Sequence, residues 1–149
     1  MLFRSDLHVS TINQMVAERI VSEDFDAHLA HLRAHYRTQA AAMLQALERH
    51  MPAGVTWTRP EGGMFVWLTL PDGLDGAALL ERSLASERVA FVPGAPFFAV
   101  DARTNTLRLS YSLPSPEDID EGVRRLARLI AGQLAKAGSN LARARTGRT

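Results

Sequence analysis

The sequence has no cysteine, and Lys136 is the only lysine among its 149 residues. Without cysteine there is no disulfide, thiolate nucleophile or cysteine-bound zinc, and we expect a cytoplasmic protein. No apolar run approaches the roughly 20 residues of a membrane span, and residues 1–6 lack the apolar core of a signal peptide. An imine-forming lysine must be partly buried so that its amine can be neutral. Lys136 is expected at an exposed helix end, which makes it a poor candidate.

The basic residues are concentrated at one end of the chain. Residues 136–149 hold four basic residues and no acidic one, although the net charge of the whole chain is only +1. A basic segment of this kind can contact nucleic acid. It lacks periodic apolar residues, however, and contains Gly138 and Gly147. We therefore expect a flexible, solvated tail and no nucleic-acid partner.

Two helices are expected in the first third of the chain. Thr11 and Gln14 fit a capping box at the start of a short helix. Residues 22–24 then predict the start of a second helix, with acids in its first turn. An apolar stripe at helical spacing predicts that this helix continues to about His50. The stripe comprises Phe25, Leu29, Leu32, Tyr36, Met43 and Leu47.

The chain after residue 54 predicts a sheet with further helices. Strands are expected at residues 55–58, 64–70, 89–92 and 107–111, and helices at 75–86 and 116–134. Asp75 and Ser115 are the expected helix caps. The uninterrupted apolar run at 64–70 predicts a strand that is covered on both faces or central in its sheet. This order predicts an α+β domain, with a small, mostly antiparallel sheet of about three to four strands covered by helices and preceded by a long helix.

One arginine stands inside the last expected strand. Leu107 and Leu109 share one face of that strand, whereas Arg108, Ser110 and Ser112 share the other. A guanidinium stays charged at any relevant pH and can bind a carboxylate through two parallel hydrogen bonds. Arg108 is therefore the candidate for binding a carboxylate. The alternative is an edge-strand arginine that reaches solvent or a surface acid.

The other candidates carry weaker signals. His28, His31 and His35 fall on one helix face, but a metal site needs a further ligand, and a solvated helix face is the simpler interpretation. The glycines at 62–63 precede a strand rather than a helix, so they predict a tight turn and not a phosphate-binding loop. The loop around Phe97 either presents aromatic rings to a ligand or folds them into the core. No catalytic, cofactor-binding or metal-binding residue is assigned.

Three segments between residues 59 and 112 carry a resemblance to a known family. They read RPEGGMFVWL at residues 59–68, VAFVPG at 89–94 and LRLSYS at 107–112. In this order and spacing they resemble the C-terminal small domain of class I/II (fold-type I) aminotransferases, which use pyridoxal phosphate. They are most similar to the 2-aminoadipate/kynurenine branch and to the aminotransferase-like half of MocR-type regulators.

The resemblance implies a domain organisation and a role for one residue. Residues 1–22 would be a remnant of the large domain or linker helix, 23–135 the small domain, and 136–149 a flexible basic tail. Arg108 would bind the α-carboxylate of the substrate. The family's cofactor lysine, the aspartate at the pyridine nitrogen and the phosphate-binding residues precede Ser5 and are outside this chain, so the chain resembles a fragment.

The implied activity belongs to the whole enzyme, which transfers an amino group between an amino acid and a 2-oxo acid. We expect the isolated chain to be inactive and to bind pyridoxal phosphate weakly. Its expected partners are the missing large domain and further copies of the same chain, as a dimer or other homo-oligomer. The alternative is an effector-binding or dimerisation fragment of a MocR-type transcriptional regulator, or a stand-alone non-enzymatic module. The motifs leave the substrate's side chain open.

Overall fold

The computed structural model describes residues 10–23 and 25–146, with the side chains in this range except those of residues 138 and 140–146. The chain divides into two compact units, Met1–His35 and Tyr36–Thr149, and the boundary lies inside a helix. Each unit is described by itself below. Within the described residues, no helix is both long enough and apolar enough to cross a membrane.

The first unit contains α1 (Thr11–Glu23) and the beginning of α2 (Phe25–His50). A short helix and a long helix that ends at His50 are both confirmed. The expected start of the long helix at residues 22–24 is wrong for Ser22 and Glu23, which belong to α1, and residue 24 lies outside the described residues. No residue of α1 is buried. Its apolar side chains are exposed, namely Ile12, Met15, Val16, Ile20 and Val21. Because helices of this length are stabilised mainly by packing of their apolar face, this face is suited to contact with another surface.

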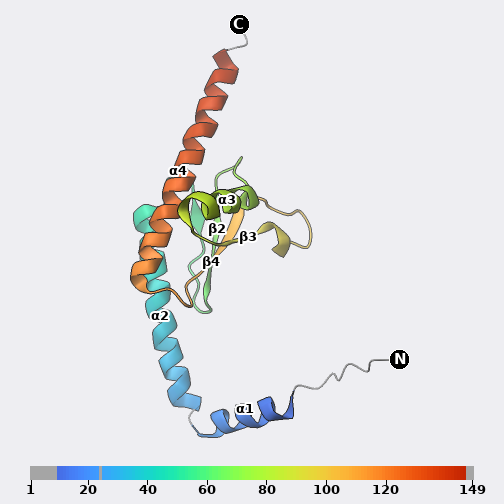
Figure 1. The fold of residues 1–149 in the computed structure, drawn as a ribbon, viewed down its shortest axis with the longest axis vertical. Helices are drawn as coiled ribbons and strands as arrows, with labels where there is room; N and C mark the ends of the chain where they lie inside the picture. The colour runs from blue at the N-terminus through green and yellow to red at the C-terminus, as the bar shows by residue number, and fades with distance from the viewer. Residues whose placement is uncertain (1–9, 24, 147–149) are drawn as a thin grey trace, which may run out of the picture. The chain divides into compact units, whose positions relative to one another are not determined.

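The second unit is built on a four-stranded sheet (Figure 1). The strands are β1 (Thr56–Trp57), β2 (Phe65–Thr69), β3 (Val92–Pro93) and β4 (Thr106–Ser110), in the spatial order β1-β2-β4-β3. All three pairings are antiparallel. The prediction of an α+β domain with a mostly antiparallel sheet is therefore confirmed, and β2 is central, as its continuous apolar run predicted.

Helices cover one face of this sheet. In Figure 1, α4 (Pro116–Thr146) runs beside the C-terminal part of α2, and α3 (Gly76–Arg82) lies next to the strands. Alternate residues of the two central strands pack against these helices in one continuous core. The core includes Met43 and Leu47 from α2, Val66 and Leu68 from β2, Leu107 and Leu109 from β4, and Val123, Leu126 and Ile130 from α4. Burial of this apolar area is the main source of stability for the second unit.

The helix caps at Asp75 and Ser115 follow the predictions. The side chain of Asp75 accepts a hydrogen bond from the backbone N–H of Ala78 at 2.9 Å, at the start of α3. Ser115 Oγ accepts from the N–H of Asp118 at 3.1 Å, at the start of α4. Each cap satisfies a backbone donor that has no partner inside the helix. Together they determine where the chain leaves the loops and enters the helical layer.

Two expected boundaries are wrong. The strand expected at residues 89–92 is reduced to Val92–Pro93, because the backbone groups of Val89 bond to Ser83 rather than to a strand. The helix from Pro116 was expected to end near Leu134 and instead continues to Thr146. No proline interrupts residues 135–146, and alanine and arginine are the most frequent residues in them. These residues have high helix propensity, which outweighs the single glycine at 138.

Candidate functional site

Arg108 lies in the middle of β4, on the sheet face opposite the helices. It pairs across the ladder with Trp67 on β2 and with Val92 on β3. Its neighbours Leu107 and Leu109 are buried in the core, whereas Arg108 itself is half-buried. The predicted alternation along this strand is therefore confirmed. A rigid central strand determines the direction in which the arginine leaves the backbone.

Two aromatic rings flank the guanidinium of Arg108. Its Cζ atom lies 4.0 Å from the ring centroid of Phe65 and 4.7 Å from that of Phe97. Phe65 belongs to β2, and Phe97 ends a short 3-10 helix, η2 (Ala95–Phe97). Both distances are well inside the range of about 6 Å over which a cation is attracted to a ring face. Phe97 of this loop thus faces the arginine, whereas Phe98 contacts Trp67.

The polar contacts of Arg108 are incomplete. Among the described residues, its Nε is the buried side-chain nitrogen or oxygen that has no hydrogen-bond partner. No acidic side chain of the described chain pairs with this guanidinium, in contrast to Arg59, which pairs with Glu48. A buried donor without an acceptor costs about 1–3 kcal/mol, and more when it is charged. The alternative of an arginine paired with a surface acid therefore does not apply to the described residues.

An open pocket of about 340 Å³ adjoins Arg108. Ser110 and Ser112 line it from the same face of the chain, and their hydroxyl oxygens lie 3.0 Å apart. Phe65, Phe91 and Val92 are among its apolar lining residues. A small concave surface with an unpaired cation and two hydroxyl groups is suited to an anionic organic molecule of modest size.

The position of Phe97 depends on Gly94. A Cβ atom built on Gly94 would overlap Thr106 Oγ1 and would lie 2.8 Å from Trp67 Cζ2. The backbone N–H of Gly94 donates to the carbonyl of Thr106 at 2.8 Å. Only glycine allows so close an approach of the loop to β4. The close crossing brings Phe97 against Trp67, with ring centroids 5.7 Å apart in an edge-to-face arrangement.

The histidine and lysine candidates lie elsewhere. His28, His31 and His35 are exposed on α2. In the described part of the chain, no group of three or more histidine, aspartate or glutamate residues could hold a metal ion. His50 Nε2 instead lies 3.0 Å from Asp120 Oδ1. Lys136 is exposed on α4.

The residues of this chain do not fit the pyridoxal phosphate that the sequence resemblance implies. An imine with that cofactor needs a lysine whose amine is partly desolvated. Lys136 is the only lysine in the sequence, and solvent surrounds it on α4. The pocket beside Arg108 supplies one cation and two hydroxyl groups but no amine. The described residues therefore contribute a candidate carboxylate site and no cofactor site.

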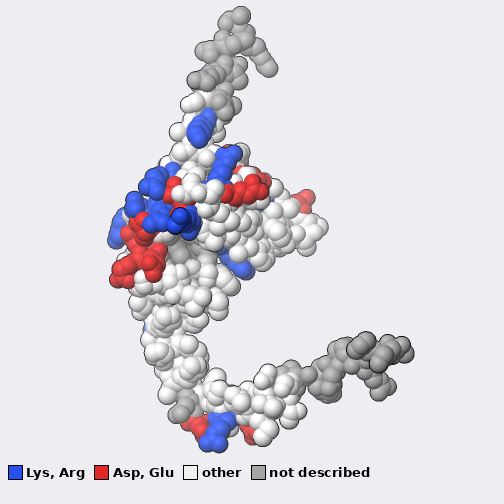
Figure 2. All heavy atoms as spheres, viewed as in Figure 1, with Lys and Arg blue, Asp and Glu red and all other residues white. Residues whose placement is uncertain are grey.

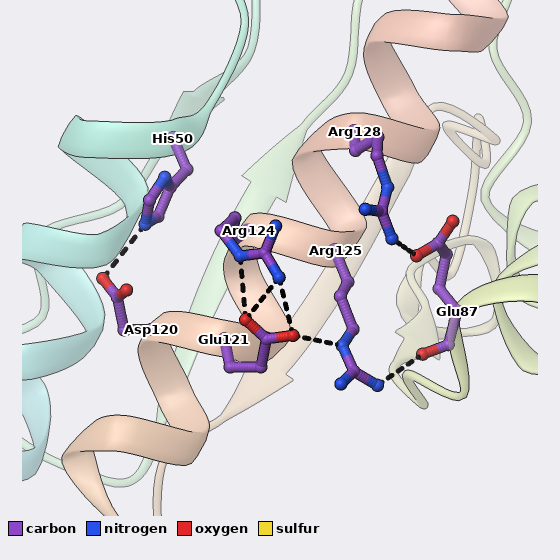
Figure 3. Close-up of polar contacts among 7 residues, drawn as sticks. All are labelled: His50, Glu87, Asp120, Glu121, Arg124, Arg125 and Arg128. Atoms are coloured by element: carbon purple, nitrogen blue, oxygen red, sulfur yellow. Dashed lines mark hydrogen bonds and ion pairs between the residues drawn. The ribbon is translucent and has the colours of Figure 1, made fainter.

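A separate network of charges lies on the outer surface of α4 (Figure 3). Glu121 accepts hydrogen bonds from Arg124 and Arg125, which hold the pKa of its carboxyl below the ordinary value, with Arg125 the larger influence. Arg128 pairs with Glu87 at 2.5 Å, and Arg125 donates to the backbone carbonyl of Glu87 at 3.4 Å. These contacts tie the end of the 83–87 helical turn to α4, which indicates a structural role.

Charges of both signs are interspersed over this surface. Figure 2 shows basic side chains next to acidic ones on the visible face of the second unit. A nucleic-acid-binding domain usually gathers basic residues in a patch or stripe. The described surface in this view carries mixed charge instead, and Arg124, Arg125 and Arg128 of α4 are engaged with acids.

Comparison with known proteins gives the family. Residues 1–126 match the family model described as aminotransferase class I and II. The chain belongs to this family. The 2-aminoadipate transaminase of Thermus thermophilus is 51% identical over 131 residues, which are 88% of this chain and 33% of that protein. The aromatic-amino-acid aminotransferase 1 of Thermococcus litoralis is 44% identical over 132 residues, which are 88% of this chain and 31% of that protein.

A solved aminotransferase shares the fold. The structure of LysN, the alpha-aminoadipate aminotransferase of Thermus thermophilus, aligns with a TM-score of 0.82 at 52% identity. That protein was crystallised with N-(5'-phosphopyridoxyl)-L-leucine. The alignment covers 87% of this chain and 33% of LysN. This chain therefore spans about a third of the length of the relatives it matches.

The sequence predicted Arg108 but not its aromatic partners. Phe65 stood inside an apolar run that indicated only a buried strand, and Phe97 stood in a loop with two open interpretations. The alternation of β2 provided a signal for Phe65, because that residue falls on the same face as Trp67, which pairs with Arg108. No comparable signal existed for Phe97, since its position depends on the path of an irregular loop.

Proposed function

We propose that this chain is the C-terminal portion of a pyridoxal-phosphate-dependent aminotransferase, in which Arg108 binds the α-carboxylate of the substrate. The complete enzyme would move an amino group from an amino acid to a 2-oxo acid. Both substrates and both products of that reaction carry an α-carboxylate. One arginine can therefore serve each half of the reaction.

One observation carries the proposal: the Arg108 guanidinium faces an open pocket with no acid beside it among the described residues. A cation held in this way is available for an external anion. A carboxylate offers two oxygens that match a guanidinium in geometry and charge. The neighbouring hydroxyls of Ser110 and Ser112 add polar lining without adding charge.

The finer assignments belong to the same proposal. The chain would represent the C-terminal third of an enzyme of the 2-aminoadipate/kynurenine branch, with residues 1–22 from the large domain or linker, 23–135 as the small domain and 136–149 as a basic tail. The identity to the Thermus 2-aminoadipate transaminase supports that branch. A Thermococcus relative that is almost as similar is named for aromatic amino acids, so the substrate's side chain does not follow from this likeness.

The cofactor would be held by the rest of the enzyme. Pyridoxal phosphate supplies an aldehyde that accepts the amino group and a ring that withdraws electrons. Since the residues of this chain do not fit that group, we expect the isolated chain to neither bind it tightly nor transaminate. The chain's own contribution would be to hold and orient the carboxylate.

The exposed apolar face of α1 would contact the missing part of the enzyme or a second subunit. Ile12, Met15 and Val16 are each more than half exposed. A continuous apolar patch of this kind is unfavourable in water and is typical of a contact surface. We therefore expect the purified chain to self-associate, and a single sharp monomer peak in size-exclusion chromatography would contradict this.

The first test is the intact mass of the endogenous polypeptide. A mass well above 16.4 kDa would support an enzyme of which this chain is a part. Its N-terminal sequence would then distinguish an aminotransferase large domain from the DNA-binding segment of a regulator. A mass of 16.4 kDa, with transamination by the purified chain, would contradict the proposal.

The second test is substitution of Arg108 in the longer polypeptide. Arg108→Gln removes a charge-assisted pair of hydrogen bonds and should raise the KM for amino acid and 2-oxo acid alike, by about ten- to a hundredfold. Arg59→Gln is the matched control, because Arg59 is exposed and already paired with Glu48. Equal kinetics of the two variants would show that Arg108 does not bind the carboxylate.

A further inference from the structure

The rings of Phe65 and Phe97 lie beside Arg108 but have no polar group that could bind a substrate. We propose that Phe65 and Phe97, together called the aromatic pair, are positioning residues that hold the Arg108 guanidinium in its binding orientation. This inference rests on the proposed function for the identity of the ligand. The geometry of the arginine is independent of the proposed function.

Arginine needs such support at this position. Its long side chain has about 2 kcal/mol of rotamer entropy to lose when it is immobilised. Binding sites usually reduce this cost through hydrogen bonds from neighbouring groups that orient the guanidinium. Arg108 lacks that support among the described residues, since its buried Nε has no acceptor. The contacts that remain are the ring faces of Phe65 and Phe97.

The aromatic pair is itself anchored from two directions. Phe65 lies on β2 opposite Ser110 of β4, so the ladder determines its position. Phe97 follows the close crossing at Gly94 and packs edge-to-face on Trp67. Trp67 in turn is the cross-strand partner of Arg108. The arginine is thus held between a ring of β2, the strand that carries Trp67, and a ring of the loop that packs on Trp67.

This arrangement also determines which atoms can reach a ligand. The Nε atom is buried and has no hydrogen-bond partner. Neither terminal nitrogen of Arg108 is left buried without a partner. Arg108 lines the pocket together with Phe65 and the two serines. A carboxylate in the pocket would therefore meet the terminal nitrogens, in an orientation set before the ligand arrives. Pre-orientation lowers the entropy cost of binding.

The test uses the arginine side-chain signals of the purified 149-residue chain by NMR, without a ligand. We expect the Arg108 Nε–H to exchange slowly with water and to be shifted upfield by the rings, relative to the exposed Arg59. Phe97→Leu keeps an apolar side chain but removes the more distant of the two rings, and should remove part of the shift while the contribution of Phe65 remains. Phe97→Tyr should restore it. Phe98→Leu is the matched control, because Phe98 contacts Trp67 but not Arg108.

Phe97 is 52% exposed, so its substitution should leave the fold intact, which an unchanged far-UV spectrum would verify. The positioning role is overturned if Arg108 gives signals like those of Arg59 in the unsubstituted chain. It is also overturned if Phe97→Leu and Phe98→Leu have the same effect on the Arg108 signals.

A kinetic arm separates this role from the proposed function. In the longer polypeptide, Phe97→Leu should raise KM about two- to fivefold with little change in kcat, and Phe97→Tyr should restore it. If Arg108→Gln raises KM but the Arg108 signals show free rotation, carboxylate binding stands and positioning is wrong. If the Arg108 signals behave as expected but neither Arg108→Gln nor Phe97→Leu alters KM, the aromatic pair positions an arginine that serves another ligand.

Discussion

The two faces of the central strands β2 and β4 differ sharply, although their residues alternate along the same backbone. On one face, Leu68 and Leu107 are fully buried beneath the helices. On the other, Arg108 meets two rings and an open pocket and lacks a partner for its Nε. On the covered face, the apolar side chains are buried in one continuous core. The open face carries an uncompensated cost, which is typical of sites kept for binding.

The largest effect should come from the covered face. Leu107→Ala removes a fully buried side chain, and lost apolar burial together with the resulting cavity should lower the free energy of unfolding by about 2–5 kcal/mol. Urea unfolding followed by circular dichroism measures this. Val92→Ala, at the exposed side chain of the edge strand, is the control. If both variants lose the same stability, the comparison between the faces is wrong.

The next effect concerns the loop that places Phe97 on the open face. Gly94→Ala would force a Cβ atom against Thr106, so either the loop or the strand must shift. Strain of this kind should cost about 1–3 kcal/mol, and it should also reduce the ring-current shift at Arg108. Gly62→Ala is the control, because nothing lies within 4 Å of a Cβ atom there.

A smaller effect is expected for the charge on the open face. Arg108→Met keeps an apolar stem of similar length and removes both the cation–ring contacts and the unpartnered Nε. The two changes oppose each other, so the free energy of unfolding should change by about 1 kcal/mol or less. The same urea measurement checks this. A loss as large as that of Leu107→Ala would show that the arginine is needed for folding rather than for a ligand.

The smallest effect concerns the exposed charges of α4. Arg125 and Arg124 lower the pKa of Glu121 in the folded chain. A lowered folded pKa stabilises the fold above the unfolded pKa, and that contribution is lost as pH falls through the folded value. Glu121→Gln should therefore decrease stability slightly at neutral pH, with the difference from the unsubstituted chain vanishing in acid. Thermal melts across this pH range test it, and high salt should weaken the effect.

The predictions that succeeded rest on local rules. The caps at Asp75 and Ser115, the long helix to His50 and the alternation around Arg108 each follow from short-range geometry, and all are present. The predictions that were wrong concern places where distant groups compete. The backbone of Val89 was expected to extend a strand, but a helical turn six residues earlier occupies its hydrogen bonds.

The sequence by itself determined the α+β class, the antiparallel sheet and the strand face on which Arg108 would lie. Periodicity and turn chemistry act over a few residues, so one chain is enough to reveal them. Only the tertiary structure decided that Phe97 would reach Arg108, that no acid of the described chain would pair with it, and that its Nε would be left without an acceptor. These features depend on where β2, β4 and an irregular loop meet, and such long-range contacts leave no local pattern.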